Sequence, residues 1–386
     1  MKIAIVHDWL DASGGAEQVL EQILLCYPQS DVFALVDFMP ECERGFLRGR
    51  KITTSFIQKI PWARKHFRRY LALMPRGIES FDLSAYDLIL SSSWAFAKGV
   101  KTNSSQTHVS YIHTPIRYAW ELQELYLQQA VSSKLLRILA RYFLGRLRDW
   151  DIKTASRGDQ LIANSQFIAE RIQRYWHRQS LVLNPPVASG DFTCAEVKED
   201  FYITVSRLVH YKAVETLVEA FNLMPDKRLV VIGDGPMFRR LQALAGPNVE
   251  LLGYQSRTVV IDYLQRARAF VFSAHEDFGI VLVEAQACGT PVIAYGQGGA
   301  LDSVVPYECP VMEGVDTERP ATGLFFEEQT AVSVVAAVDR FEALEGGISP
   351  RACAANAARF APEYFRNAFM AIVEQTLENR LRSTQG

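Results

Sequence analysis

The sequence predicts two α/β domains in series, each a doubly wound, Rossmann-like domain built on a parallel sheet. Short runs of β-branched residues alternate with longer helical stretches, which is typical of parallel α/β units. Runs such as Leu229–Ile232 are apolar throughout, which indicates strands buried on both faces. A chain of 386 residues is long enough to form two such domains, each with its own core.

The predicted strands fall into two sets. In the first half they are expected at 2–6, 31–36, 87–91, 108–112 and 160–163. In the second half they are expected at 202–205, 229–232, 249–252, 269–272, 292–294 and 323–326. Two consecutive prolines, Pro185 and Pro186, predict a break between the domains, because proline continues neither a helix nor a central strand. The domains are therefore expected at 1–184 and 185–365, with 366–386 as a helix that crosses back to the first domain.

Composition excludes several classes of protein. The formal net charge of −2 indicates no general affinity for nucleic acid. We expect no signal peptide, because the first residues form a strand-like run, and no apolar run comes near the roughly 20 residues that span a bilayer. The six cysteines are scattered without a CxxC pair, so we expect free thiols in a reducing cytoplasm and no metal site.

Two segments are unusually basic and aromatic. Residues 44–78 contain ten Lys or Arg and no Asp or Glu, with apolar and aromatic side chains between them. Residues 134–148 form a second basic stretch with a helical apolar pattern. Such segments can lie on an anionic membrane surface, so we expect peripheral contact with the cytoplasmic membrane. The alternative is a solvated helix face that packs on its own domain.

Ligands of open parallel sheets bind beyond the carboxyl ends of the strands. In the second half, the residues after four strands can therefore meet at one crevice. Arg207 and Lys212 follow the first of these strands, and Gly233 follows the second. Two cations at such a crevice suit a diphosphate leaving group when no metal neutralises it. The alternative is that they are two surface cations near a loop.

Glu276 and Glu284 follow the strand 269–272. The first lies in a loop and the second lies inside the helix that is predicted to begin near Gly279. A loop carboxylate can accept hydrogen bonds from sugar hydroxyls, and a helical one can bind two ribose hydroxyls. The helix start also offers free N–H groups to an anion.

The run 276–285 with 288–294 closely resembles the signature of retaining glycosyltransferase family 4, whose GT-B fold has two Rossmann-like domains facing a central cleft. The resemblance extends to 13–17, 206–212, 231–236, 298–305 and 323–326. Two departures are visible. Tyr211 and Ala213 flank Lys212 where the family usually carries a glycine, and Asp302 stands where glutamate is common.

By this resemblance, the C-terminal domain binds a nucleotide-sugar donor. Arg207 and Lys212 would bind its diphosphate, and Glu284 its ribose. The transferred sugar would be held by Glu276 and by the backbone of Phe278, Gly279 and Ile280. Three glycines are also expected to contact the donor, namely Gly233, Gly14 and Gly15. Glycines at 14 and 15 would let the first loop come close to the phosphates, where side chains would block it.

The N-terminal domain is expected to bind the acceptor. His113 follows the strand 108–112, and the resemblance implies that it donates a hydrogen bond to a hydroxyl of the donor sugar. His7 and Asp8 follow the first strand and are candidates for acceptor contact. Glu17, at the start of the next helix, is placed equally for acceptor contact or for capping. The stretch 111–120 and the opening 7–10 resemble bacterial mannosyltransferases that build surface polysaccharides from GDP-mannose.

The sequence thus predicts a metal-independent retaining glycosyltransferase without a cofactor, transferring mannose from GDP-mannose to a glycan or polyprenyl-linked acceptor. A disaccharide phosphorylase of the same fold and a non-catalytic nucleotide-sugar-binding protein remain alternatives. A dinucleotide oxidoreductase is disfavoured because no GxGxxG follows the first strand. The DxD motif at 149–151 ends a basic helical stretch, so we expect it to form salt bridges with the neighbouring Arg146, Arg148 and Lys153.

Overall fold

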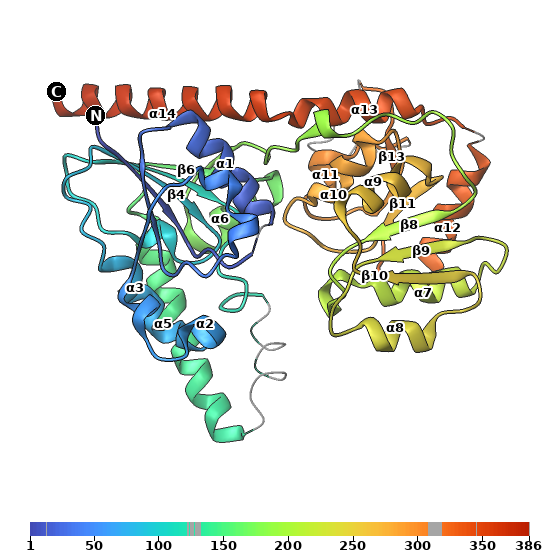
Figure 1. The fold of residues 1–386 in the computed structure, drawn as a ribbon, viewed down its shortest axis with the longest axis horizontal. Coiled ribbons are helices and arrows are strands. Elements are labelled where there is room, and N and C mark those ends of the chain that lie inside the picture. Colours follow the sequence, from blue (N-terminus) through green and yellow to red (C-terminus); the bar gives the residue numbers. More distant parts are fainter. Residues whose placement is uncertain are drawn as a thin grey trace. The chain divides into compact units, whose positions relative to one another are not determined.

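The computed structural model describes residues 1–12, 14–121, 123, 127, 133–307, 319–344 and 346–385. The chain divides into two compact units. Unit 1 combines Met1–Pro185 with the C-terminal segment from Phe365, and unit 2 is Pro186–Tyr364. Each unit has its own parallel sheet with helices on both faces (Figure 1), so the predicted α/β class with two Rossmann-like domains is confirmed.

Unit 1 contains a seven-stranded parallel sheet in the order β3-β2-β1-β4-β5-β6-β7. Its strands are β1 (Ile3–His7), β2 (Asp31–Ala34), β3 (Ile52–Thr54), β4 (Leu88–Ser93), β5 (Thr107–Ile112), β6 (Gln160–Ala163) and β7 (Leu181–Val182). Its helices are α1 (Gly15–Cys26), α2 (Ala63–His66), α3 (Met74–Glu79), α5 (Lys134–Ala155), α6 (Gln166–Trp176) and most of α14 (Pro362–Gln385).

Alternation along the strands of unit 1 divides its core into two layers, because successive side chains of a strand point to opposite faces. Ile5 of β1 packs with α1 and with Phe365 and Phe369 of α14. Its neighbours Ala4 and Val6 pack with residues of α3 and α5 on the other face. Helix α14 is fixed along this unit by polar contacts as well, since Arg380 donates to the Asp159 carboxylate at 2.5 Å.

Unit 2 contains a six-stranded parallel sheet in the order β10-β9-β8-β11-β12-β13. Its strands are β8 (Tyr202–Val205), β9 (Leu229–Ile232), β10 (Val249–Gly253), β11 (Ala269–Phe272), β12 (Val292–Tyr295) and β13 (Gly323–Phe326). Its helices are α7 (Val214–Asn222), α8 (Phe238–Leu244), α9 (Arg257–Arg266), α10 (Ile280–Ala287), α11 (Ala300–Ser303), α12 (Ala331–Ala343) and α13 (Pro350–Ala357).

Every predicted strand is present, with small shifts at the strand ends. The sequence analysis missed β3 and β7, which are the two edge strands of unit 1 and have three and two residues. Among the helices of the described residues, none combines the length and the apolar composition needed to cross a membrane.

Candidate functional site

The sheet of unit 2 has a topological switch point between the adjacent strands β8 and β11. From β8 the chain continues towards β9 and β10, whereas from β11 it continues to β12 and β13 on the other side. The loops that follow β8 and β11 therefore diverge and leave a crevice at the carboxyl edge of the sheet, where ligands of such folds bind. The first loop carries Arg207 and Lys212, and the second carries Glu276.

Lys212 and Glu276 form an ion pair across this switch point, between Nζ and Oε1. Both side chains are largely but not fully buried, with 16% and 15% exposed. The loop that carries Lys212 is held from β11, because the Ser273 hydroxyl lies 3.1 Å from the carbonyl of Lys212 and 2.8 Å from that of Ala213. The structure thus brings together a cation and a carboxylate that the sequence assigned to the same crevice.

Arg207 lies in the same loop with its side chain exposed, and it makes no ion pair with any residue that the structure describes. The loop after β9 packs directly beneath it. A Cβ on Gly233, whose φ is +143°, would lie 1.8 Å from the carbonyl oxygen of Ser206. Glycine is therefore required at position 233 for the close approach of the two loops, which in turn fixes the backbone that carries Arg207.

The backbone of the Glu276 loop is held by two further glycines. The amide of Gly299 donates to the carbonyl of Glu276 at 2.9 Å. A Cβ on Gly298 would lie 2.4 Å from that same carbonyl, and one on Gly299 would lie 2.1 Å from Cα of Phe278. Gly279 has a φ of +85° and precedes the first residue of α10, Ile280. The predicted helix start is thus present, and its amides face the end of this loop.

Glu284 lies on the second turn of α10 and pairs with Arg257 at the start of α9, with 3.3 Å between Oε1 and Nη1. Burial raises the pKa of the Glu284 carboxyl, while the Arg257 guanidinium opposes this shift. Arg257 also lies 3.6 Å from Asp191. The sequence analysis missed Arg257, because α9 shows no motif and only the packing of α9 beside α10 places this arginine at the carboxylate.

Ala213 has a left-handed backbone with φ +51° and ψ +31°, at the residue before α7. An L-residue pays roughly 1–2 kcal/mol in this conformation, whereas glycine adopts it freely but loses more entropy on folding. We therefore expect Ala213→Gly to stabilise unit 2 by up to about 1 kcal/mol. That gain corresponds to a rise of about 2–4 °C in its calorimetric transition.

A matched control for this change is Ala220→Gly, in the interior of α7. There the same substitution should lower stability, because glycine weakens a helix interior by about 1 kcal/mol. Equal shifts of the same sign for both variants would contradict the conformational explanation.

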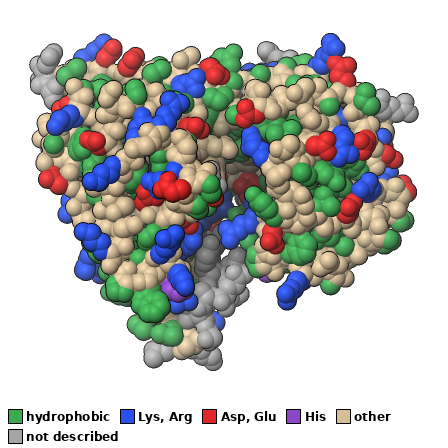
Figure 2. Space-filling view, in the orientation of Figure 1, with side chains coloured by type: hydrophobic (Ala, Val, Ile, Leu, Met, Phe, Trp, Pro, Cys, Tyr) green, Lys and Arg blue, Asp and Glu red, His purple; other side chains and the backbone are tan. Residues whose placement is uncertain are grey.

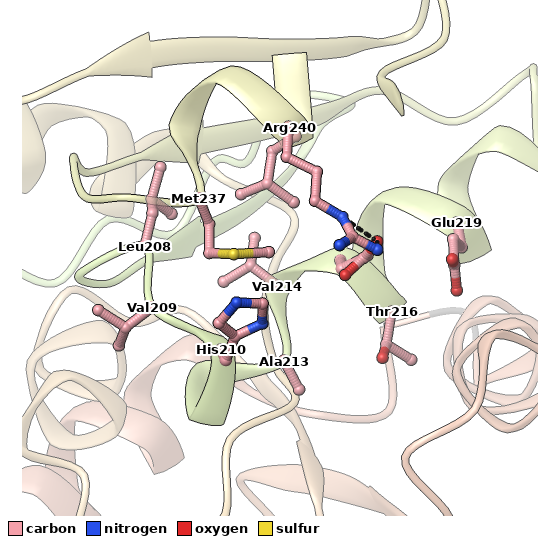
Figure 3. A pocket seen from close by; sticks show the side chains of 11 residues that line it. Leu208, Val209, His210, Ala213, Val214, Thr216, Glu219, Met237 and Arg240 are labelled. Carbon is pink, nitrogen blue, oxygen red and sulfur yellow. Dashed lines mark hydrogen bonds and ion pairs between the residues drawn. The ribbon is translucent and has the colours of Figure 1, made fainter. Parts of the chain in front are cut away.

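A pocket of about 380 Å³ adjoins the β8 loop (Figure 3). Its walls come from the loop, the first turns of α7 and the facing helix α8, and its rim carries the ion pair between Arg240 and Glu215. Figure 3 shows His210, Val214 and Met237 close together at one side of it. None of the residues predicted to bind the donor lines this pocket.

In unit 1 the switch point lies between β1 and β4. His7 ends β1, and its Nε2 lies 3.5 Å from Oε1 of Glu17 in the first turn of α1. His7 is fully buried and Glu17 is 7% exposed. Gly14 precedes α1 in an extended conformation with φ −159°, and Gly15 begins the helix. A Cβ on Gly14 would lie 3.2 Å from Oε2 of Glu17, so this glycine also makes room for the Glu17 carboxylate.

Asp8 has a structural role in this loop. Its carboxylate accepts hydrogen bonds from four successive amides, those of residues 94 to 97, at 2.5–2.9 Å. The side chain is fully buried, which raises its pKa, and the amide hydrogen bonds oppose that shift. With both oxygens occupied and no exposed surface, Asp8 has no free face for an acceptor in this structure, contrary to the role expected from the sequence.

His113 follows β5 and is held by β4. Its Nε2 lies 2.8 Å from the hydroxyl of Ser92, and its amide donates to the carbonyl of Ser93. The ring packs edge-on against Trp94, which also contacts His7. Burial, with a smaller contribution from His7, lowers the pKa of His113 to about 3. The imidazole is therefore neutral at physiological pH and able to exchange neutral hydrogen bonds.

His108 in β5 is a second neutral imidazole, because burial lowers its pKa to about 4. Both pKa values lie below the usual 6.5, so the folded state binds fewer protons than the unfolded chain as the pH falls below 6.5. Each histidine should then reduce stability by up to about 1.4 kcal/mol per pH unit until its folded pKa is reached. We expect the imidazole nitrogen signals of both to stay in the neutral form from pH 8 to pH 5 in ¹⁵N NMR spectra. A midpoint near 6.5 for either histidine, assigned by its glutamine variant, would contradict this prediction.

Asp151 of the DxD motif has other partners than predicted. Asp151 is fully buried and accepts from Lys98 Nζ at 2.5 Å, not from the neighbouring basic residues of α5. The indole N–H groups of Trp120 and Trp176 each donate to its other oxygen at 2.8 Å. Within the described residues, no group of three His, Cys, Asp or Glu side chains is arranged to hold a metal ion.

Residues 193–360 match the family model described as glycosyl transferases group 1. The matched range lies within unit 2. The matched range contains every site residue that the sequence analysis assigned to the second domain. It includes both loops at the switch point, the Lys212–Glu276 ion pair and Glu284 on α10.

Comparison with solved structures shows that the fold of the chain is of the GT-B type. The chain aligns with Anabaena HepE, solved in complex with UDP and glucose, at a TM-score of 0.68 and 18% identity, over 97% of this chain and 99% of HepE.

One curated relative is the GDP-mannose-dependent monoacylated alpha-(1-6)-phosphatidylinositol monomannoside mannosyltransferase of Corynebacterium glutamicum. The chain is 36% identical to it over 129 residues, which are 30% of this chain and 34% of the relative. It is 28% identical over 271 residues to the sulfoquinovosyl transferase SQD2 of Arabidopsis thaliana, covering 66% of this chain and 50% of that relative. The chain thus spans between about a third and a half of the length of these relatives.

Proposed function

We propose that the chain is a retaining glycosyltransferase that moves a hexose from a nucleotide-sugar to a glycan or lipid-linked acceptor. The observation that carries this proposal is the match of residues 193–360 to the group 1 glycosyl transferase model, together with a switch point in this range that presents Lys212 and Glu276. The fold alone would not support a proposed activity, because one fold is used for many activities. The charged groups at the switch point suit a diphosphate bound to a sugar.

In this proposal, Lys212 and the exposed Arg207 bind the donor diphosphate and stabilise the charge that develops on it. Without donor, Lys212 is paired with Glu276. An entering diphosphate competes for the ammonium group and frees the Glu276 carboxylate to accept hydrogen bonds from sugar hydroxyls. The amides at the start of α10 lie beside the same loop, and Glu284 binds the ribose in place of Arg257.

The reaction follows from these roles. The bond between the anomeric carbon and the diphosphate oxygen breaks, and the acceptor oxygen forms a bond to that carbon on the same face. The acceptor proton passes to the departing phosphate oxygen. The chain supplies leaving-group stabilisation and orientation, to which the neutral His113 contributes a hydrogen bond to the sugar. Because two cations neutralise the diphosphate, we expect turnover to persist in the presence of a chelator.

GDP-mannose is the proposed donor, supported by the mannosyltransferase relative from Corynebacterium glutamicum and by the resemblance of 7–10 and 111–120 to mannosyltransferases. SQD2, with its different sugar, is the reason to test several donors. A thermal-shift panel of GDP-, UDP- and ADP-sugars should single out GDP-mannose, because a ligand at about 100 times its dissociation constant adds about 2.7 kcal/mol. A shift with UDP-glucose alone would reject GDP-mannose as the donor.

A second assay tests transfer itself. With the stabilising nucleotide-sugar, we expect slow donor hydrolysis without acceptor and formation of an α-linked product with a glycan or polyprenyl-linked acceptor. Sugar-1-phosphate formation that depends on inorganic phosphate would instead indicate a phosphorylase. A stabilising donor that is never consumed would indicate a binding protein.

A further inference from the structure

We propose that unit 1 binds the surface of an anionic lipid bilayer through a patch formed by Trp62 with its flanking cations and by the outer face of α5. We call this the α2–α5 patch. The proposal goes beyond the proposed glycosyl transfer and does not depend on it, since it concerns only which surface the protein docks on.

Trp62 is the most exposed aromatic side chain of unit 1 among the described residues, with 75% of its surface in solvent. It precedes α2 with a left-handed backbone, φ +66°. That conformation is costly for a bulky residue, and here it is held by amides of Lys65 and His66 that donate to the Trp62 carbonyl at 3.0 Å. A strained residue held in place by its neighbours indicates a function for that position. The fold keeps a large indole in solvent instead of burying it.

Four cations around Trp62 form no ion pair with any described residue, whereas the nearby Arg68 pairs with Asp11. The four are Lys59, Arg64, Lys65 and Arg69, which are all exposed. Residues 44–78 supply no acidic side chain to neutralise them. Figure 2 shows hydrophobic side chains beside Lys and Arg side chains at the lower end of unit 1. An indole amid unpaired cations suits the headgroup region of a membrane with negative lipids.

Helix α5 is apolar on two sides. Ala140, Phe143, Leu144 and Leu147 face the core cluster that also contains Ile57 and Phe67. The solvent-facing side chains are also large and apolar, with exposed fractions of 61% for Ile138, 56% for Leu139 and 67% for Tyr142. One side of this helix therefore packs on its own domain, and the other side exposes large apolar side chains.

Both parts of the patch are anchored in the same hydrophobic cluster, which contains residues of 56–74 and of α5. A bilayer fits the combined surface better than a protein partner does. Lysine is depleted at protein interfaces, whereas cations interspersed with Trp, Leu and Ile are typical of surfaces that lie at the lipid headgroups. Large apolar side chains that are exposed together on one part of a domain indicate a site that binds another protein or a membrane.

The test is flotation of the full chain with vesicles, without any nucleotide-sugar. We expect binding to vesicles of phosphatidylcholine mixed with phosphatidylglycerol, weaker binding as the salt concentration rises, and little binding to phosphatidylcholine alone. The triple variant Lys59→Gln, Arg64→Gln, Lys65→Gln should lower the partition coefficient by about a hundredfold, since each cation near an anionic surface contributes about a factor of five. Trp62→Ala should lower it about tenfold.

Controls come from unit 2, where Arg239 is exposed on α8 and Tyr364 is 64% exposed. Arg239→Gln and Tyr364→Ala should leave vesicle binding unchanged, and circular dichroism should show that all variants are folded. Equal loss in the control variants, or unchanged binding in the patch variants, would overturn the proposal. So would a concentration-dependent dimer in sedimentation that Trp62→Ala abolishes, because the patch would then bind a second copy.

Discussion

Replacing Lys212 by alanine is expected to lower the turnover of sugar transfer by between about a hundredfold and a thousandfold. The reason is that the ammonium group stabilises negative charge that grows on the diphosphate as the sugar leaves, and the loss of one such donor costs about 2.7–4 kcal/mol in related situations. Because the charge is larger in the transition state than in the bound donor, kcat should fall more than KM rises. Steady-state kinetics with the donor identified by thermal shift measures both quantities.

Two further variants make this prediction specific. Arg239→Ala removes an exposed cation of the same unit outside the switch point and should leave turnover unchanged. Glu276→Gln removes the partner that holds Lys212 in the empty site while keeping its shape. If Lys212→Ala retained normal turnover while Glu276→Gln lost it, the diphosphate role would belong to another cation, with Arg207 the first candidate.

The fold was predictable wherever the sequence pattern is set by burial. The central strands of unit 2 are covered on two faces, which favours apolar residues on both, and runs such as Leu229–Ile232 reveal them directly. The edge strand β3, Ile52–Thr54, is only partly buried and lies inside a basic segment. Its position comes from pairing with β2, which is a tertiary contact that leaves no periodic pattern in three residues.

The site was predictable to the extent that it depends on strand ends. Lys212 and Glu276 could be assigned to one crevice because each follows a parallel strand and the strands are neighbours. Partners that come from elsewhere in the fold could not be predicted this way. The pairing of Glu284 with Arg257 needs the packing of α9 beside α10, and the enclosure of Asp8 needs the four amides after β4.

The buried pair of Lys98 and Asp151 also joins residues that the sequence did not predict to be partners. Among the variants predicted here, loss of this pair is expected to lower the free energy of unfolding the most. Lys98 is 2% exposed and lies against the rings of Trp150 and Trp176. Removing one partner of a buried pair leaves an uncompensated charge and costs about 3–5 kcal/mol. Lys98→Met should therefore destabilise unit 1 by this amount, because Asp151 would keep only its two indole donors.

Tryptophan fluorescence during urea unfolding is well suited to this measurement, since all six tryptophans of the chain lie in unit 1. The matched control is Arg228→Met in unit 2, whose partner Glu250 is also exposed, with 53% and 45% of the two side chains in solvent. That exposed pair should contribute less than about 1 kcal/mol, and circular dichroism should show little change in the unfolding of the control. If Lys98→Met lowered the free energy of unfolding no more than the control does, Asp151 would have to be neutral in the folded state. The double variant Lys98→Met, Asp151→Asn would then be as stable as Lys98→Met. A double variant that recovers part of the lost stability would instead show that the unpaired carboxylate causes the loss.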